Sequence, residues 1–325
     1  MKAWFINEIG EPKDVMNIQH VPKPEPSSGE VLVKIEAAAL NFFDILQCQG
    51  KYQEKHETPF IPGAEIAGIV EAANGEIFGK GQRVLATPLL PNGGLAEWVT
   101  VKEMDVFPIP DGLPFSEAAA FFITYQTAYF ALHRTGRIKA GDVLLVHAGS
   151  GGVGSAAIQL GKAAGAYVIA TAGSDEKLEI CKQLGADVVI NYRTEDFIQI
   201  VKNETGGKGA NIIFDPVGGD TFDQSRKSIA FEGRILVIGF AGGRIADAPT
   251  NHALIKNYSI LGVHFGLFRK LYPEEVKKAH DDLMELFLAG KISPLIYKEY
   301  LFEEVPEALD HLADRKTYGK LVVTP

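Results

Sequence analysis

Residues 144–154 read LLVHAGSGGVG, a short apolar run followed by glycines at positions 149, 151 and 154. The spacing G-x-G-x-x-G, directly after a predicted strand and before a predicted helix, is typical of a loop that binds a pyrophosphate. The glycines permit a tight turn and close approach of the backbone, and the helix N-terminus offers free N–H groups to the anion. The residues predicted to bind a dinucleotide here are Gly149, Ser150, Gly151, Gly152, Val153 and Gly154. A purely structural glycine turn is the alternative.

The surrounding sequence alternates strands with helices. Apolar runs at 167–172 (YVIATA), 187–192 (DVVINY), 211–218 (NIIFDPVG) and 234–240 (RILVIGF) are separated by helical stretches. Strand–helix–strand alternation at this spacing predicts an α/β fold with a doubly wound parallel sheet, the Rossmann arrangement.

The first third of the chain has a different texture. Residues 30–37 (EVLVKIEA) alternate apolar and polar side chains, and shorter strand candidates at 65–72, 83–87 and 96–101 are interrupted by Gly and Pro. This pattern predicts a β-rich, partly open barrel. A helical run from Ser116, a plausible N-cap, to Gly136 marks the boundary between two domains, as expected for 325 residues.

The second predicted strand of the parallel sheet indicates which dinucleotide binds. NAD sites carry an acidic residue at the end of this strand, but here the strand ends at Ala172. Asp175 and Glu176 fall in the first turn of the next helix, where they complement the helix dipole. Ser174 and Lys177 can instead hold a 2′-phosphate. NADPH is therefore the predicted cofactor, with a solvated surface lysine as the alternative interpretation of Lys177.

Composition excludes several classes of protein. A net charge of −9 without clustered Lys and Arg argues against nucleic-acid binding. The two cysteines, Cys48 and Cys181, form neither a disulfide framework nor a metal-ligand pattern. No signal-peptide or membrane-spanning run is present, so we expect a cytoplasmic protein without a membrane partner.

Several longer segments carry a family resemblance. These are AGSGGVGSAAIQLGKAAGAYVIAT (148–171), EKLEICKQLGADVVINY (176–192), FDPVGG (214–219), AALNFFDILQCQGKY (38–52), PFIPGAEIAGIV (59–70), NGGLAEWV (92–99) and ITYQTAYFAL (123–132). Together they resemble the medium-chain dehydrogenase/reductase superfamily, and within it the zinc-independent quinone oxidoreductase group that includes zeta-crystallin. The resemblance implies a GroES-like catalytic domain (1–122 and 263–325), a Rossmann domain (123–262), an active site between them and a homodimer.

Zinc-dependent members of that superfamily hold a catalytic metal that this sequence does not support. By resemblance, Asn41 and Ala64 stand where those members have a Cys and a His, and a third ligand position falls near Ile123. The four-cysteine lobe of a structural zinc has no counterpart between Leu90 and Pro114. Because zinc sites need converging Cys, His or carboxylate ligands, we expect no metal. Reduction of an electrophile does not require a Lewis acid, since hydrogen-bond donors can stabilise the charge that develops on oxygen.

The resemblance also suggests roles for single residues. Asn41 would face the nicotinamide and the substrate, and Tyr52 would line the substrate pocket; a turn-forming Asn and an ordinary packed Tyr are the alternatives. Leu46 replaces a tyrosine frequent in the group and makes the pocket more apolar. The further residues expected to contact the cofactor or border its site are Thr127, Tyr192, Gly239, Phe240, His264, Phe265 and Lys320. Each also has a plain structural interpretation, as core, helix-packing or surface residue.

The sequence therefore predicts an NADPH-dependent quinone oxidoreductase. Two alternatives stay open: a reductase of conjugated enals and enones, and a crystallin-like protein that binds the nucleotide without turnover.

Overall fold

The computed structural model describes residues 1–324, which form two compact units. One unit comprises Met1–Ile123 together with the segment from Pro294 onward, and the other comprises Thr124–Ser293. No helix of the described chain is both long and apolar enough to cross a membrane.

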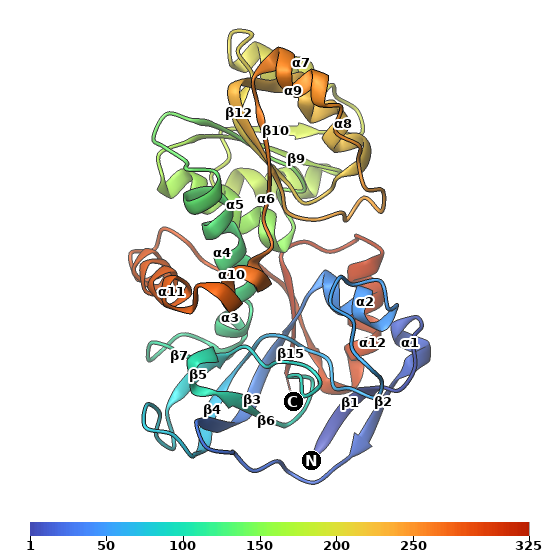
Figure 1. The fold of residues 1–325 in the computed structure, drawn as a ribbon, viewed down its shortest axis with the longest axis vertical. Helices are drawn as coiled ribbons and strands as arrows, with labels where there is room; N and C mark the ends of the chain where they lie inside the picture. The colour runs from blue at the N-terminus through green and yellow to red at the C-terminus, as the bar shows by residue number, and fades with distance from the viewer. Residues whose placement is uncertain (325) are drawn as a thin grey trace. The chain divides into compact units, whose positions relative to one another are not determined.

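The Thr124–Ser293 unit, which we call the nucleotide unit, contains a six-stranded parallel sheet (Figure 1). Its strands are β8 (Val143–Val146), β9 (Tyr167–Ala172), β10 (Val188–Asn191), β11 (Ala210–Asp215), β12 (Ile229–Val237) and β13 (Ser259–Gly262). They lie in the order β10-β9-β8-β11-β12-β13, so the first strand is central and the order reverses beside it. This is the doubly wound arrangement predicted from the sequence, and ligands of such sheets bind at the carboxyl ends of the strands.

Helices connect and cover these strands. They are α4 (Phe122–Tyr129), the π-helical stretch η2 (Phe130–Thr135), α5 (Gly152–Ala163), α6 (Asp175–Gln183), α7 (Phe197–Glu204), α8 (Gly219–Ser228), α9 (Thr250–Lys256), α10 (Phe265–Leu271) and α11 (Pro273–Leu288). α5 and α6 pack against β8, β9 and β10, and α8 and α9 pack against the other half of the sheet. Neighbouring strands contribute Leu145, Ile169, Ile190, Ile213 and Ile235, all fully buried, to one apolar core.

The second boundary between the units lies at Ser293/Pro294, whereas residues 263–293 were predicted to belong to the catalytic domain. α10 and α11 belong to the nucleotide unit because they pack on α4 and η2. The rings of Phe130 and Phe265 lie 5.7 Å apart, and Gln126 Nε2 donates to the Val276 carbonyl at 3.0 Å.

The other unit, which we call the β-rich unit, is drawn in blue to green and in red in Figure 1, because both the first third and the last segment of the chain contribute to it. Its strands are β1 (Lys2–Ile6), β2 (Met16–His20), β3 (Glu30–Leu40), β4 (Ile66–Ala73), β5 (Arg83–Ala86), β6 (Trp98–Lys102), β7 (Val106–Pro108), β14 (Ile296–Leu301) and β15 (Lys320–Thr324). Its helices are α1 (Pro12–Val15), α2 (Phe42–Cys48), α3 (Phe115–Ala119) and α12 (Val305–Ala313), with short 3₁₀ turns η1 (Glu103–Asp105) and η3 (Phe302–Glu304).

β3 organises the β-rich unit. It pairs antiparallel with β4, β6 and β15, so that the sheet runs β14-β15-β3-β4-β5-β7 with β6 also on β3. Leu40 at the end of β3 pairs with Leu321, and Ala38 pairs with Ile66. This register brings the end of β3 and the starts of β4 and β15 to the same edge of the sheet.

Candidate functional site

The glycine-rich loop joins β8 to α5, and its glycines are required by close contacts. A Cβ on Gly154 would lie 2.2 Å from the Ala148 carbonyl oxygen, and one on Gly149 would lie 2.9 Å from Cys181 Sγ. The Gly149 N–H donates to the Thr171 carbonyl at 2.9 Å, which ties the loop to the end of β9. Side chains at these positions would push the loop away from the sheet.

The loop also presents unused donors. Among the described residues, the amides of Gly152, Val153 and Gly154 donate no hydrogen bond, as expected for the first turn of a helix. A Cβ on Gly151 would meet only the Ala148 carbonyl, at 3.3 Å, and Ser150 is buried beside it. An open backbone surface with aligned N–H groups fits a pyrophosphate.

Two cations and two hydroxyls gather where β9 and β10 end. Ser174 is the N-cap of α6, and its Oγ accepts the Lys177 N–H at 3.4 Å. A Cβ on Gly173 would lie 2.6 Å from Tyr192 Oη and 3.2 Å from Arg193 Nε, so both side chains lie against the strand end. Burial lowers the pKa of Lys177, Glu176 raises it and the charge of Arg193 lowers it again. An anionic group would relieve this repulsion.

Arg193 was not among the residues predicted from the sequence. It directly follows Tyr192, which was predicted, but its relevance depends on β10 being the neighbour of β9. A basic residue just beyond the third strand is the signal that could have identified it, once the strand order was assumed.

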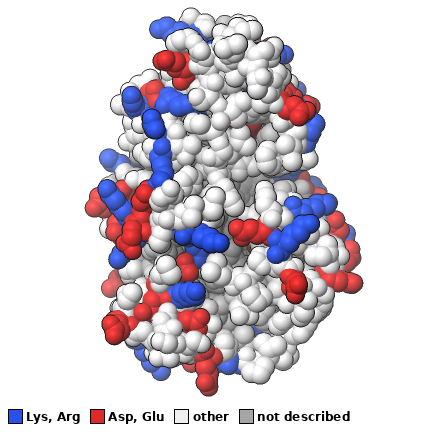
Figure 2. Space-filling view, viewed as in Figure 1, with Lys and Arg blue, Asp and Glu red and all other residues white. Residues whose placement is uncertain are grey.

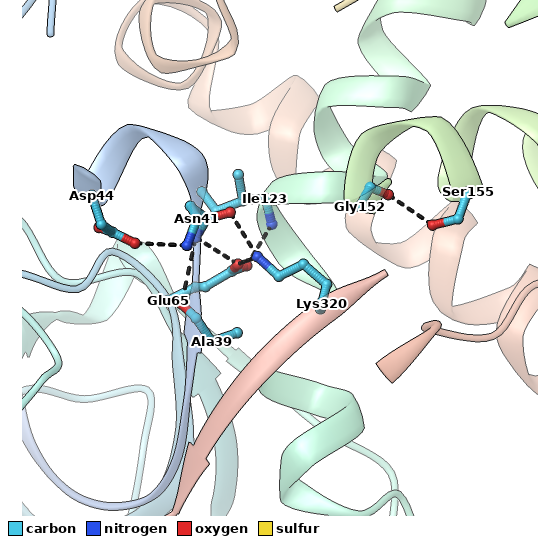
Figure 3. A network of polar contacts seen from close by, with 8 residues as sticks. All are labelled: Ala39, Asn41, Asp44, Glu65, Ile123, Gly152, Ser155 and Lys320. Atoms are coloured by element: carbon cyan, nitrogen blue, oxygen red, sulfur yellow. Dashed lines mark hydrogen bonds and ion pairs between the residues drawn. The ribbon is translucent and has the colours of Figure 1, made fainter. Parts of the chain in front are cut away.

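A buried polar cluster lies at the edge of the β-rich sheet defined by β3, β4 and β15 (Figure 3). Lys320 Nζ lies 2.5 Å from Glu65 Oε1 and donates to Asn41 Oδ1 at 2.6 Å. Asn41 Nδ2 donates to the same Glu65 oxygen at 2.9 Å, while Glu65 Oε2 accepts the Ile123 N–H at 2.9 Å. Only 1% of Glu65, 5% of Lys320 and 8% of Asn41 is exposed, so these contacts fix Asn41 in one orientation.

Asp44 adds a second carboxyl to this cluster. Its Oδ2 accepts the Asn41 backbone N–H at 2.7 Å, and its Oδ1 has no hydrogen-bond partner among residues 1–324. Complete burial raises the pKa of Asp44 to about 7; the Asn41 hydrogen bond and Lys320 oppose the increase, and Glu65 adds to it. Below that pH Asp44 is protonated and adds no negative charge to the cluster.

Comparisons with known proteins place this geometry in a family. The chain matches the models "Alcohol dehydrogenase GroES-like domain" over residues 27–111 and "Zinc-binding dehydrogenase" over residues 152–284. It is 37% identical to the quinone oxidoreductase-like protein 2 homolog of Nematostella vectensis, across 99% of this chain and 88% of that protein. The chain belongs to the quinone oxidoreductase group of the medium-chain dehydrogenase/reductase superfamily.

Solved structures agree with this assignment. The mycobacterial protein Rv1454c, complexed with NADPH, is 31% identical with a TM-score of 0.93, and both chains are covered completely. The quinone oxidoreductase of Thermus thermophilus, also solved with NADPH, is 33% identical with a TM-score of 0.88 over the full length of both chains. The protein is therefore an oxidoreductase of a group that uses nicotinamide cofactors, and its β-rich unit contains the GroES-like fold that the sequence predicted.

In this oxidoreductase the positions of the zinc ligands have other contacts. Asn41, which replaces a cysteine by resemblance, is bonded to Glu65 and Lys320. Within residues 1–324, no three His, Cys, Asp or Glu side chains lie close enough together to hold a metal ion. The carboxylate beside Asn41 is neutralised by a lysine.

Tyr52 makes no hydrogen bond with Asn41, Glu65 or Lys320 among residues 1–324, and of the cluster only the charge of Asp44 acts on its pKa. Its ring packs against Phe43, with centroids 5.4 Å apart, and it lines a cavity of about 230 Å³ with Gln47, His56 and Phe60. Asn41 is not among the described residues that line this cavity. Burial raises the pKa of Tyr52, so its hydroxyl stays protonated at neutral pH.

The other predicted residues of the oxidoreductase fall into two groups. Thr127 is nearly buried on α4, and Gly239 and Phe240 follow the end of β12, at the ligand-binding edge of the parallel sheet. Phe265 instead packs into the interior of the nucleotide unit against Phe130, and His264 is an exposed residue at the N-cap of α10. Lys320, expected near a cofactor phosphate, has Glu65 and Asn41 as its partners.

Proposed function

We propose that this oxidoreductase reduces a quinone with NADPH as the hydride donor. The observation that carries the proposal is the corner formed by Ser174, Lys177 and Arg193, which offers a hydroxyl and two cations where NAD sites have a carboxylate. The two similar proteins solved with NADPH support the same cofactor.

The glycine-rich loop would hold the pyrophosphate through its free amides, and NADPH supplies a hydride when bound. Residues of this chain would then have to orient the substrate and stabilise charge on its oxygen. Lys320 uses two of its N–H groups on Asn41 and Glu65, which leaves one N–H without a partner among residues 1–324. We propose that Asn41 and Tyr52 form hydrogen bonds to the substrate, and that Tyr52 or water donates the proton that completes the reduction.

Conjugated enals and enones are a second candidate substrate class. The observation that favours them is Leu46, an apolar residue on α2 where the group frequently has a tyrosine. Reduction of an aliphatic enone develops negative charge on a single carbonyl oxygen. Such a substrate therefore needs a tyrosine at this position less than a quinone does.

We also propose a homodimer formed through β13. This strand is the outer strand of the parallel sheet and has no partner on its far side among residues 1–324. Ile260 on β13 and Leu254 and Ile255 on α9 are exposed by 37%, 77% and 78%. Pairing of two such strands would cover both the open backbone edge and these apolar side chains.

Steady-state kinetics with NADPH and NADH tests the cofactor. We expect wild-type protein to prefer NADPH, and Lys177→Ala and Arg193→Ala each to lower the ratio of kcat/KM for NADPH over NADH by about tenfold or more, since each removes one charged contact. Lys182→Ala, on the same helix but exposed and facing Glu179, is the matched control. An unchanged ratio in both variants would refute the 2′-phosphate corner.

The same assay run with 1,4-naphthoquinone, a 2-alkenal and a cyclic enone identifies the acceptor. Turnover of the quinone alone supports the main proposal, and turnover of the alkenal or enone alone supports the second candidate. NADPH binding in calorimetry without turnover of any acceptor would refute both and favour a role in nucleotide binding.

A further inference from the structure

The nucleotide unit has a surface depression of about 220 Å³ whose lining is rich in lysine. We call it the lysine pocket; it is lined by Lys202, Gly207, Lys208, Gly209, Lys227, Ile229, Phe231 and Lys256. Acidic residues outnumber basic ones in the chain by 41 to 32, yet the charged residues of this lining are all lysines. A local positive field in an acidic protein favours an anionic ligand.

The lysine pocket lies at the opposite end of the sheet from the glycine-rich loop. Its residues come from the start of β12, the turn before β11 and the last turns of α7, α8 and α9. The glycine-rich loop follows the carboxyl end of β8. Because β11 has six residues, the two edges are separated by roughly 20 Å, so a dinucleotide bound along the carboxyl edge does not fill the lysine pocket.

The lysine charges in this pocket are not neutralised by the protein. No ion pair involves Lys202, Lys208, Lys227 or Lys256 in the described part of the chain. Lys256 Nζ donates only to the carbonyls of Arg226 and Lys227, at 3.2 and 3.1 Å. Figure 2 shows acidic and basic side chains interspersed over the face viewed.

The pKa shifts of Lys256, which lines the pocket, and of nearby His252 indicate the same positive field. Burial lowers the pKa of Lys256, and the charge of Lys202 lowers it further. The pKa of His252 is lowered by burial and then by Arg226 and Lys256. Helix dipoles favour lysine in a last turn, which accounts for Lys202, Lys227 and Lys256 individually but not for Lys208, which lies in a turn. They do not account for lysines from three helices and a turn around one depression.

We propose that the lysine pocket binds the phosphate group of a small phosphorylated molecule. Each ammonium can donate up to three hydrogen bonds, and a phosphate accepts several at once. The pocket has room for a phosphate with a small group attached, and the ring of Phe231, which is 68% exposed, provides an apolar wall beside it. The phosphate belongs either to an inorganic anion or to an organic ester such as a nucleoside monophosphate.

Calorimetry on the full-length protein, with NADPH present to occupy the dinucleotide site, tests this proposal. The probes are inorganic pyrophosphate and AMP. We expect saturable binding of at least one probe, and a rise in its Kd of about tenfold in Lys202→Gln and in Lys208→Gln. Neither ammonium has a hydrogen-bond or ion-pair partner within residues 1–324, so the variants should keep the fold. Lys277→Gln, an exposed lysine on α11, is the control and should bind like the wild type.

The outcomes separate the two sources of phosphate. AMP binding that is tighter than pyrophosphate binding and is weakened by Phe231→Ala assigns an organic ester, whereas pyrophosphate binding that is unaffected by Phe231→Ala assigns an inorganic anion. Absence of saturable binding for both probes, or equal weakening in Lys277→Gln, overturns the proposal. The result does not depend on the proposed reaction, because the lysine pocket and the dinucleotide site lie at opposite edges of the sheet.

Discussion

Replacement of Glu65 by Gln tests whether the buried cluster in the β-rich unit is held by charge. The substitution preserves size and leaves one amide oxygen as an acceptor, but it removes the negative charge beside Lys320. The lysine, which is 5% exposed, would then keep only neutral acceptors, Asn41 Oδ1 and the amide oxygen of the new glutamine. The new amide N–H₂ would also face either the Ile123 N–H or the donors of Asn41 and Lys320.

The expected loss of stability follows from these contacts. At 2.5 Å and an effective dielectric constant of about 20, the attraction between Lys320 and Glu65 is about 7 kcal/mol before desolvation is subtracted. Removal of one partner from a buried pair typically costs about 3–5 kcal/mol, because the other charge remains buried. We expect Glu65→Gln to lower the free energy of unfolding of the β-rich unit by that amount.

Urea denaturation followed by tryptophan fluorescence measures this loss, because both tryptophans, Trp4 and Trp98, lie in the β-rich unit. The double variant Glu65→Gln/Lys320→Met removes both charges and should recover about 2 kcal/mol or more of the loss. Glu303→Gln breaks an exposed, solvent-screened pair with Lys2 in the same unit and should cost far less than Glu65→Gln. The reasoning is refuted if Glu65→Gln costs no more than Glu303→Gln, or if the two substitutions in the double variant are additive.

The remaining predictions concern Asp44, the glycine-rich loop and the absence of a metal. Burial raises the pKa of Asp44 from 3.8 to about 7, so the wild type loses stability as the pH rises from about 4 to 7. The free energy of unfolding of Asp44→Asn should equal that of the wild type at pH 4 and exceed it above pH 7 by up to about 4 kcal/mol. Urea curves at several pH values measure this, and an advantage that does not grow with pH would contradict it. Gly154→Ala should lower the free energy of unfolding of the nucleotide unit by about 1–3 kcal/mol because its Cβ would collide with the Ala148 carbonyl, whereas Gly151→Ala should leave stability nearly unchanged and weaken NADPH binding in calorimetry. Dialysis against EDTA should leave turnover unchanged in the reductase assay, and a loss that zinc restores would show that the metal-free interpretation is wrong.

The parallel sheet was predictable because its signals are local. The run YVIATA corresponds to β9 at both ends, and DVVINY differs from β10 by one residue at each end. The helix predicted from Ser116 to Gly136 was only partly right. It begins at Phe115 with Pro114 as the N-cap, and it divides into α3, α4 and η2. This stretch is apolar on nearly every face, so its sequence carries no periodic signal for the interruptions.

Residues whose roles depend on distant partners were harder to predict. The glycine-rich loop was found because strand, turn and helix are contiguous in the sequence. Arg193 was missed because only the order of the strands brings it to the end of β9. Glu65 was not among the site residues predicted from the sequence, because its pairing with Lys320, 255 positions away, depends on the register of β3 with β4 and β15.

That register connects the missing metal ligands to the lysine. Glu65 is almost completely buried before β4, and a carboxylate there requires a neighbouring positive charge. Asn41 and Ala64 supply none, since an amide is neutral and alanine has no polar group. Lys320 reaches the carboxylate only because β15, from the far end of the chain, pairs with β3. The charge balance of the cluster thus depends on a strand that the C-terminal segment contributes. A change that displaced β15 would leave Glu65 buried without a counter-charge. Asn41 would also lose the hydrogen bond from Lys320 that fixes its side-chain oxygen Oδ1.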